Sequence, residues 1–475
     1  MRMVSLLIII SYLFSYAFAC ASQTSADIEL IQPYLRQRIE KYKKGVGIVV
    51  GIVDSRGSRI VGYGKPAQLS ERNVDADTIF EIGSVTKVFT TTLLAMMVTS
   101  GEVKLEDPIS KYLPRTVSVP SRDGREITLL DLATHTSGLP RLPTNLSPES
   151  YEDPYADYTV EQMYAFLSNY SPKSIGTKYE YSNYGMGLLG HILALKAGKS
   201  YEQLISERIC KPLKMHSTAI NLSAQLQTRL AVGHAADLRP VANWHIPTLA
   251  GAGALRSTVS DLLKFLSANL GLTKTRMLPA LEMTHRPRYS GVGMQVGLGW
   301  HIFNNHGTEI LWHNGTTGGY SSFVGIDKKK RRGVVVLSNA VHSVDDIGLH
   351  LLEEKYPLYK ERVAVQVDPK LLDAYVDIYK IGSDSYTVFR LLNRLFFRSG
   401  KDSNRAESEF FIRGSNTSFS FVKDSTFAGM LIHRGDGTGI LAKKFGEAVL
   451  TERVAIVLEP EICDAYGCQH CSYKK

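Results

Sequence analysis

Strand signals at two distant places constrain this chain more than any other feature. The β-branched run Val46–Val53, the turn at Asp54–Gly57 and the stretch Ile60–Tyr63 predict a buried pair of strands. Further strand signals come only after a long helical and loop-rich interval, at Gly297–Phe303, Ile310–His313, Tyr320–Gly325 and Gly333–Leu337. Because both sets need one apolar core, we predict an α+β fold. Its antiparallel sheet is completed by distant parts of the sequence, is flanked by helices and carries an inserted helical region.

The chain is also too long for one typical core, since it has 475 residues. Towards the C-terminus, short alternating runs such as Ser418–Val422 and Phe427–Ile432 are separated by glycine-containing turns. This pattern predicts a small C-terminal β domain. The expected organisation is a main domain over residues 25–355, a β-rich domain over residues 365–460 and a tail over residues 461–475.

The N-terminus has the features of an export signal. Arg2 is followed by the apolar run Val4–Phe18, which ends in small residues. A charged start, an apolar stretch and a small-residue cleavage site predict a signal peptide over residues 1–19. The run is too short for a confident membrane span. Cys20 is also similar to a bacterial lipoprotein site, although Ala17 stands where leucine is usual. We therefore expect a secreted or periplasmic protein, with lipid anchoring to the membrane through Cys20 as the alternative.

The charge of the chain does not indicate a nucleic-acid partner. The 55 basic and 46 acidic residues give a net charge of +9 but are spread along the sequence. The dense basic run Lys328–Arg332 follows a strand signal, and we interpret it as a solvated hairpin turn. Arg434-Gly435-Asp436 is interpreted as turn chemistry and not as an adhesion signal. No zinc finger or nucleic-acid motif is found, so we expect no nucleic-acid binding.

Three of the four remaining cysteines lie in the tail. Cys463, Cys468 and Cys471 lie close to His470, whereas Cys210 is isolated. In an exported protein a disulfide within the tail is the favoured interpretation. A zinc site of three cysteines and one histidine is the alternative, but it lacks the usual paired spacing. We predict no metal in the functional site.

The candidate nucleophile is Ser84, in the sequence Gly83-Ser84-Val85-Thr86-Lys87. The apolar segment Val85–Val98 predicts a buried helix, so Ser84 is expected at its N-terminus with Lys87 on the same face. Free backbone N–H groups and the positive end of the helix favour chemistry there. A lysine in a partly dry site loses its proton more readily and can activate a serine. The same spacing recurs at Ser420/Lys423 and Ser472/Lys475, but neither pair precedes an apolar helix.

Two further strings add polar groups that suit the same chemistry. Tyr181 and Asn183 precede a predicted helix beginning near Gly185, and a tyrosine beside a lysine can act as a base. An asparagine amide can hold a substrate carbonyl. The alternative interpretation is a packed aromatic residue and a helix cap.

The second string is Trp312-His313-Asn314-Gly315-Thr316-Thr317-Gly318-Gly319-Tyr320. Its glycines allow a substrate to lie against a strand edge, where backbone N–H groups can bind an oxyanion. His313 is a candidate donor to a substrate carboxylate or a proton shuttle. The alternative is a structural histidine beside a glycine-rich turn.

These elements, in this order, resemble the penicillin-recognising serine hydrolases. Within that superfamily, Tyr-x-Asn is similar to the group of class C β-lactamases, D-Ala-D-Ala carboxypeptidases and related esterases. Further strings look like that group, and the likeness runs from about Ile28 to Leu351. They are Phe80-Glu-Ile-Gly-Ser-Val-Thr-Lys87, Leu129-Leu-Asp-Leu-Ala-Thr-His-Thr-Ser-Gly-Leu-Pro140 and Gly251-Ala-Gly-Ala-Leu-Arg-Ser-Thr258.

The resemblance implies a role for each matching residue. Ser84 would be the acylated nucleophile, Lys87 and Tyr181 would share general-base work, and Asn183 would position the substrate amide. The N–H groups of Ser84 and Thr316 would form the oxyanion hole, with His313 and Gly315 lining the substrate site. Which of Lys87 and Tyr181 takes the serine proton stays open. No cofactor is implied, since an acyl-enzyme route needs none.

One departure bears on the substrate. Class C β-lactamases have Lys-Thr-Gly in the third element, whereas this chain has His313-Asn314-Gly315. A histidine in this position is similar to the third element of certain D,D-carboxypeptidases, D-amino-acid peptidases and esterases. Loss of the fixed lysine charge weakens the case for efficient penicillin hydrolysis. We expect a D-Ala-D-Ala carboxypeptidase-type hydrolase or D-amino-acid peptidase. The alternatives are an esterase, a β-lactamase, or a non-catalytic relative that binds wall peptide or a partner. The C-terminal domain resembles the barrel-like appendages of some such enzymes.

Overall fold

The computed structural model describes residues 28, 30–291, 294–305 and 307–360. Beyond these it describes residue 373 and the segments 376–381, 384–391, 394–399, 408–409, 418–423, 428–433 and 439–444. The predicted signal peptide, Cys20, the Arg434–Asp436 triplet and the cysteine-containing tail lie outside the described residues. The chain divides into two compact units, one up to Leu352 and one from Glu353 onward.

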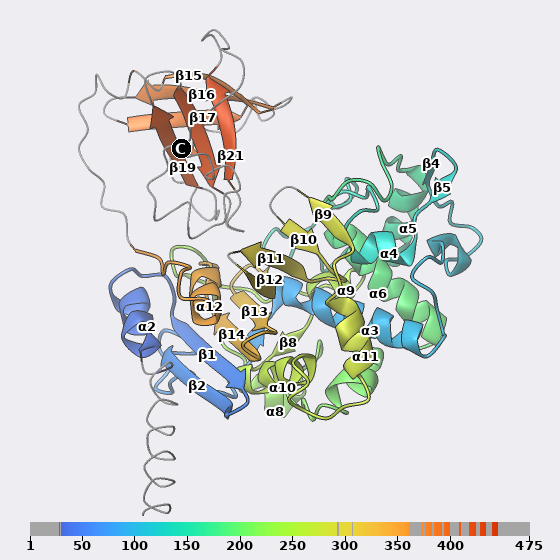
Figure 1. Ribbon diagram of the computed structural model, residues 1–475, viewed down its shortest axis with the longest axis horizontal. Coiled ribbons are helices and arrows are strands. Elements are labelled where there is room, and N and C mark those ends of the chain that lie inside the picture. The colour runs from blue at the N-terminus through green and yellow to red at the C-terminus, as the bar shows by residue number, and fades with distance from the viewer. Residues whose placement is uncertain are drawn as a thin grey trace, which may run out of the picture. The chain divides into compact units, whose positions relative to one another are not determined.

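The first unit is built on one eight-stranded antiparallel sheet, in the order β2-β1-β14-β13-β12-β11-β10-β9 (Figure 1). The first strand pair lies beside the last strand of the unit, with Val50 opposite Val336. This confirms the predicted α+β fold, in which distant parts of the chain complete one sheet. The strands are β1 (Gly47–Asp54), β2 (Gly57–Gly64), β9 (Tyr289–Gly291), β10 (Met294–Val296), β11 (His301–Asn305), β12 (Thr308–Thr316), β13 (Ser321–Asp327) and β14 (Arg332–Ser338).

Helices cover both faces of this sheet (Figure 1). The helix α10 (Val259–Asn269) packs on one face so closely that a Cβ on Gly51 would come 2.4 Å from Val259 Cγ1. The helix α12 (Asp345–Leu352) covers the other face, where a Cβ on Gly325 would come 2.7 Å from Leu352 Cδ1. The first helix, α2 (Ile31–Glu40), lies beside α12. Burial of apolar side chains between these layers is the main stabilisation of the unit.

The inserted region between β2 and β9 supplies most of the helices. Its central helix is α3 (Thr86–Thr99), which is buried on nearly all sides. Its side chains are apolar except for Lys87 and several threonines, and Thr91 and Thr92 donate their hydroxyls to carbonyl groups one turn earlier. The other helical elements are η1 (Gly83–Val85), η2 (Ile109–Lys111), α4 (Leu129–Ala133), α5 (Val160–Asn169), α6 (Asn183–Ala197), α7 (Tyr201–Ile205), η3 (Ser206–Cys210), α8 (Ala224–Gln227), α9 (Ala250–Gly253), α10 and α11 (Leu278–Thr284). Short strand pairs lie between them: β3 (Phe80–Glu81) with β8 (Arg256–Ser257), β4 (Ser121–Arg122) with β5 (Arg125–Glu126), and β6 (Gly233–His234) with β7 (Pro240–Val241).

Some predicted boundaries were wrong. The strand expected at Gly297–Phe303 begins only at His301, because Gly299 has a φ of +70° and turns the chain first. Four residues of the basic run, Lys328–Arg331, do form the turn between β13 and β14, with Arg331 in the left-handed region at a φ of +49°, and Arg332 begins β14.

The second unit is β-rich. Its described strands form one antiparallel sheet in the order β18-β17-β16-β15-β21-β20-β19. Among the described pairings β18 and β19 are edge strands, so the barrel-like closure that the resemblance implied is not among them. The strands are β15 (Asp377–Ile381), β16 (Asp384–Leu391), β17 (Arg394–Ser399), β18 (Ser408–Glu409), β19 (Ser418–Lys423), β20 (Ala428–His433) and β21 (Gly439–Lys444).

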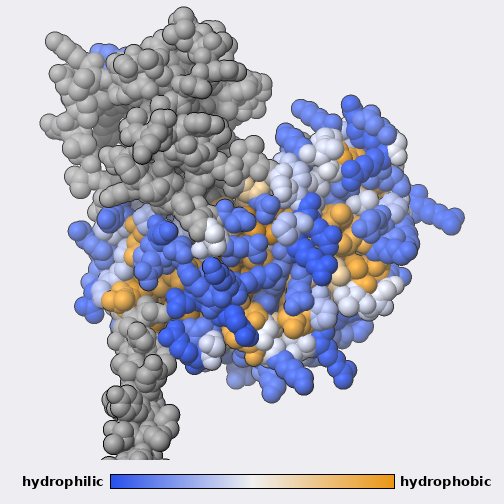
Figure 2. Space-filling view, in the orientation of Figure 1, coloured by the Kyte–Doolittle hydropathy of each residue, from blue (hydrophilic) through white to orange (hydrophobic). Residues whose placement is uncertain are grey.

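Hydrophilic residues predominate on the face of the first unit shown in Figure 2, and apolar residues form small groups between them. Within the described part of the chain, no helix has the length and apolar character needed to cross a membrane.

Candidate functional site

Ser84 lies in the single turn η1, directly before the buried helix α3. Gly83 makes this geometry accessible, since its φ of +48° is in the left-handed region and a Cβ would come 2.9 Å from the backbone nitrogen of Thr316. The Ser84 side chain is only half-buried. The turn therefore presents a serine hydroxyl at the mouth of the helix, beside the end of β12.

Lys87 stands one turn further on and is completely buried. Its Nζ lies 2.8 Å from Ser84 Oγ and donates to the carbonyl of Ala252 at 2.7 Å. Burial, and then the positive charge of Arg141, lower the pKa of Lys87 well below its usual range. A neutral amine in contact with a serine hydroxyl can accept its proton.

Tyr181 completes this cluster from the loop before α6. Its hydroxyl is hydrogen-bonded to Ser84, and the Nζ of Lys87 lies 4.9 Å from the centre of its ring. Burial raises the pKa of Tyr181 to about 12. This effect is larger than the opposing effects of the Ser84 hydrogen bond and the Arg141 charge, which lower the pKa. The phenol is therefore protonated at neutral pH, which suits a proton donor or relay better than a phenolate base.

The string Leu129–Pro140 and the next residue hold the Tyr181 loop in place. The carbonyl of His135 accepts the N–H of Glu180 at 2.7 Å, and His135 Nδ1 accepts the N–H of Ser182 at 3.1 Å. The carbonyl of Arg141 accepts the N–H of Asn183 at 3.0 Å. His135 itself has a φ of +59°, a strained value for a residue other than glycine. This loop is thus fixed by backbone and imidazole contacts on both sides of Tyr181.

Asn183 is the first residue of α6 and does not cap it. The cap is Ser182, whose hydroxyl accepts the N–H of Gly185 at 2.8 Å. The Asn183 side chain donates a hydrogen bond to Tyr155, while its Oδ1 is buried with no partner among the described residues. A buried amide oxygen in this state is suited to accept an N–H from a bound molecule.

The third predicted string forms the end of β12, against η1. A Cβ on Gly315 would come 2.1 Å from the carbonyl oxygen of Ile82 and 2.9 Å from the backbone nitrogen of Ser84. Ser322 on the neighbouring strand donates to the same Ile82 carbonyl at 2.8 Å. Glycine is therefore required here, and the backbones of Ser84 and Thr316 lie side by side.

His313 is buried and its protonation can be read from its contacts. Its Nδ1 lies 2.6 Å from the carbonyl oxygen of Asn314, so that nitrogen carries the proton. The ring stacks on His301 with 4.8 Å between centres. Burial first, and then the His301 and Lys87 charges, lower the pKa of His313 well below its usual range. The neutral ring leaves Nε2 with a lone pair and no partner among the described residues. It can accept a hydrogen bond but cannot donate one from Nε2.

Two aromatic side chains, Trp244 and Tyr155, lie near the glycine-rich segment that follows β12. Glu81 accepts the N–H of Trp244 at 3.0 Å and pairs with Arg256 at 3.3 Å, which fixes the Trp244 segment. A Cβ on Gly318 would come 2.6 Å from Trp244 Nε1, and Tyr155 packs edge-on against Trp244 with 5.4 Å between ring centres.

The residues predicted to form one site do lie together in the structure. They are Ser84, Lys87, Tyr181, Asn183, His313, Gly315 and Thr316. Sequence analysis did not single out several further neighbours of Tyr181. They are His135, with 4.5 Å between ring centres, His301, with 6.4 Å, and Arg141, 5.1 Å from the ring centre. The signal for His135 was its place in a string already quoted for the resemblance. His301 and Arg141 had no comparable signal.

No other feature in the described residues competes with this site. Ser420 and Lys423 both lie in β19 of the second unit, and Ser472/Lys475 lie outside the described residues. No group of three or more metal-binding side chains is arranged for a metal ion within the described ranges.

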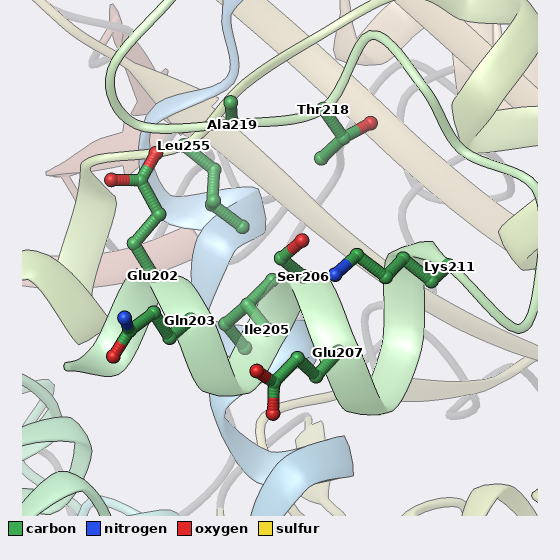
Figure 3. A pocket seen from close by; sticks show the side chains of 9 residues that line it. All are labelled: Glu202, Gln203, Ile205, Ser206, Glu207, Lys211, Thr218, Ala219 and Leu255. Atoms are coloured by element: carbon green, nitrogen blue, oxygen red, sulfur yellow. The ribbon is translucent and has the colours of Figure 1, made fainter. Parts of the chain in front are cut away.

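A separate pocket of about 280 Å³ lies where α7 and η3 face Thr218 and Ala219 (Figure 3). Its Glu202 is already engaged by the N–H groups of Ile220 and Asn221.

Comparisons with known proteins agree with this geometry. The Beta-lactamase family model matches residues 35–354. The chain is 28% identical to a β-lactamase of Pseudomonas fluorescens over 62% of this chain and 88% of that protein. It is 29% identical to the D-alanyl-D-alanine-carboxypeptidase/endopeptidase AmpH of Escherichia coli K12, over 69% of this chain and 90% of that protein.

Solved structures are also similar. A class C β-lactamase from Rhodobacter sphaeroides aligns with a TM-score of 0.57 and 26% identity, over 65% of this chain and 93% of that one. A β-lactamase/D-alanine carboxypeptidase from Yersinia pestis aligns with a TM-score of 0.58 and 25% identity, over 66% and 94%. The resemblance inferred from the motifs is confirmed: the chain belongs to the Beta-lactamase family of serine hydrolases.

Proposed function

We propose that this chain is an exported D-amino-acid peptidase of the D-Ala-D-Ala carboxypeptidase type that acts through an acyl-enzyme on Ser84. The observation that carries the proposal is the 2.8 Å contact between Ser84 Oγ and the buried Lys87 Nζ, with the protonated Tyr181 beside both. The likeness to the E. coli carboxypeptidase/endopeptidase supports the choice of substrate.

In the first step Lys87 takes the Ser84 proton as Oγ attacks the substrate carbonyl carbon. The resulting oxyanion accepts hydrogen bonds from the N–H groups of Ser84 and Thr316, which adjoin where η1 meets β12. The C–N bond then breaks, and the leaving amine receives a proton through Tyr181, which regains one from Lys87. Water attacks the acyl-enzyme with the same proton path in reverse, releasing the acid and restoring Ser84.

His313 distinguishes this site from that of the class C β-lactamases, whose third element begins with lysine. Its neutral ring offers a lone pair where a lysine would offer a positive charge, so it can accept an N–H but does not attract an anion. The second candidate is a β-lactamase or an esterase using the same residues, and the likeness to the P. fluorescens β-lactamase supports the first of these.

The test is a substrate panel with the Ser84→Ala variant as control. We expect release of D-alanine from an N-acyl-D-Ala-D-Ala peptide, followed by mass spectrometry, and no release by Ser84→Ala. Cleavage of short esters or of penicillins without any release of D-alanine would overturn the peptidase proposal in favour of the second candidate.

Export is part of the proposal and is tested separately. We expect the mature protein to start at Cys20, and N-terminal sequencing of protein recovered from a bacterial periplasm or medium measures this. Incorporation of labelled palmitate that is lost in Cys20→Ala indicates the lipid-anchored form. Full-length protein retained in the cytoplasm would contradict export.

A further inference from the structure

The proposed site has no positive charge at His313, the position that the sequence indicated for contact with a substrate carboxylate. His313 is neutral, and its Nε2 presents a lone pair. Lys87 is buried and already in contact with Ser84 and Ala252. Neither side chain offers a cation to an anionic group on a substrate.

Arg141 supplies such a cation from another element. It follows Pro140, and its backbone is fixed because its carbonyl accepts the N–H groups of Asn183 and Tyr184 at 3.0 and 3.3 Å. The side chain is exposed, yet its guanidinium carbon lies 5.1 Å from the centre of the Tyr181 ring. Across the described part of the chain, no carboxylate pairs with this guanidinium. An arginine at the mouth of a site, stacked on an aromatic ring and not neutralised, is suited to bind a carboxylate in a bidentate manner.

The position of Arg141 indicates which part of a substrate it meets. Its charge lowers the pKa of Tyr155, against the larger effect of burial, and Tyr155 is hydrogen-bonded to Asn183. The carbonyl of Arg141 also accepts the N–H of Asn183, so Arg141 lies on the Asn183 side of Tyr181. Asn183 is the group expected to hold the substrate amide, so the neighbouring part of a substrate is its acyl portion.

We propose that Arg141 is a specificity-determining residue that binds a carboxylate on the acyl portion of the substrate, a few bonds before the scissile amide. The preferred substrate class is then an acidic peptide ending in D-amino acids. This inference rests on the proposed function, because it assigns the acyl side through the role of Asn183.

The experiment compares N-succinyl-D-Ala-D-Ala with N-butyryl-D-Ala-D-Ala, which have nearly the same shape and differ by a carboxylate. The native protein should favour the succinyl peptide by about tenfold in kcat/KM, chiefly through KM, since a charged hydrogen bond is worth that much. Arg141→Gln should abolish the preference and Arg141→Lys should retain part of it. Arg115→Gln, which removes another exposed arginine elsewhere, should leave the ratio unchanged.

A binding measurement separates this inference from the proposed function. Calorimetric titration of both peptides into Ser84→Ala protein, with and without Arg141→Gln, does not depend on turnover. Tighter binding of the succinyl peptide that requires Arg141 supports the inference even if the native protein releases no D-alanine. Equal binding and equal turnover of the two peptides by the native protein would overturn it. So would an Arg141→Gln variant that weakens both peptides equally.

Discussion

The Nζ of Lys87 lies 2.8 Å from the Oγ of Ser84 in a position where Lys87 has no exposure to solvent. A charged ammonium is costly there, because burial removes its hydration and the nearby Arg141 repels it. The burial that places Lys87 against Ser84 therefore also keeps Lys87 in the neutral form that can act as a base. Tyr181, held protonated beside them, completes a path for one proton between nucleophile and leaving group.

The first prediction concerns the pH dependence of acylation. The rate should rise with pH as Lys87 loses its proton, with the midpoint well below the usual lysine pKa of 10.5. It should not fall again near neutral pH, since Tyr181 keeps its proton up to about pH 12. Stopped-flow acylation rates between pH 5 and 10 measure this. In Lys87→Met the acylation rate should fall by about 10²–10⁴-fold and should no longer increase with pH. An unchanged pH profile in that variant would show that another residue is the general base.

The second prediction concerns the loop that carries Tyr181. His135→Gly should lower kcat, because glycine adopts the φ of +59° without strain but has no side chain to accept the N–H of Ser182. We expect a loss of about tenfold or more in kcat, measured on folded protein whose Tm is determined alongside. Activity equal to native would show that the backbone contacts of residues 135 and 141 suffice to hold the loop.

The third prediction concerns the contact between β12 and η1. Gly315→Ala should strongly reduce activity, since its Cβ would come 2.1 Å from the Ile82 carbonyl oxygen and must push β12 away from Ser84. Gly253→Ala is the matched control, because the nearest atom to its Cβ, Ile246 Cδ1, is at 3.4 Å. Turnover and Tm of both variants test this; equal effects of the two substitutions would contradict it.

The fourth prediction concerns a buried carboxyl next to the site. Asp345 accepts a hydrogen bond from Asn314 at 2.7 Å, and burial raises its pKa to about 7 despite that bond. The stabilisation that protonated Asp345 gives the folded state is therefore fully present below its unfolded pKa of 3.8 and is lost as pH rises through about 7. Asparagine does not ionise, so Asp345→Asn does not lose stability in this pH range. Its Tm relative to the native protein should increase between pH 4 and 8, and a constant difference would show that Asp345 is ionised in the fold.

Much of this arrangement could be predicted from sequence because the signals are local. The β-branched run that became β1 and the apolar segment that became α3 each show their burial in their own residues. Ser84 stood out from Ser420 and Ser472 because only it precedes such a helix. That the two distant sets of strands complete one sheet followed from the need for one shared core.

Other features depend on contacts between distant segments and left no local signal. Arg141 matters because its carbonyl meets the N–H of Asn183 and its side chain meets Tyr181. The neutral state of His313 depends on the Asn314 carbonyl and on stacking against His301 from β11. The start of β11 was misplaced because the sequence does not reveal the positive φ of Gly299.

The central claim is that Ser84 is the residue acylated, and intact-protein mass spectrometry followed by peptide mapping tests it most directly. After incubation with a fluorophosphonate or an N-acyl-D-alanine ester, we predict one adduct, on the peptide containing Ser84, and none in Ser84→Ala. A native protein that stays unmodified, or an adduct that persists in Ser84→Ala, would contradict the account.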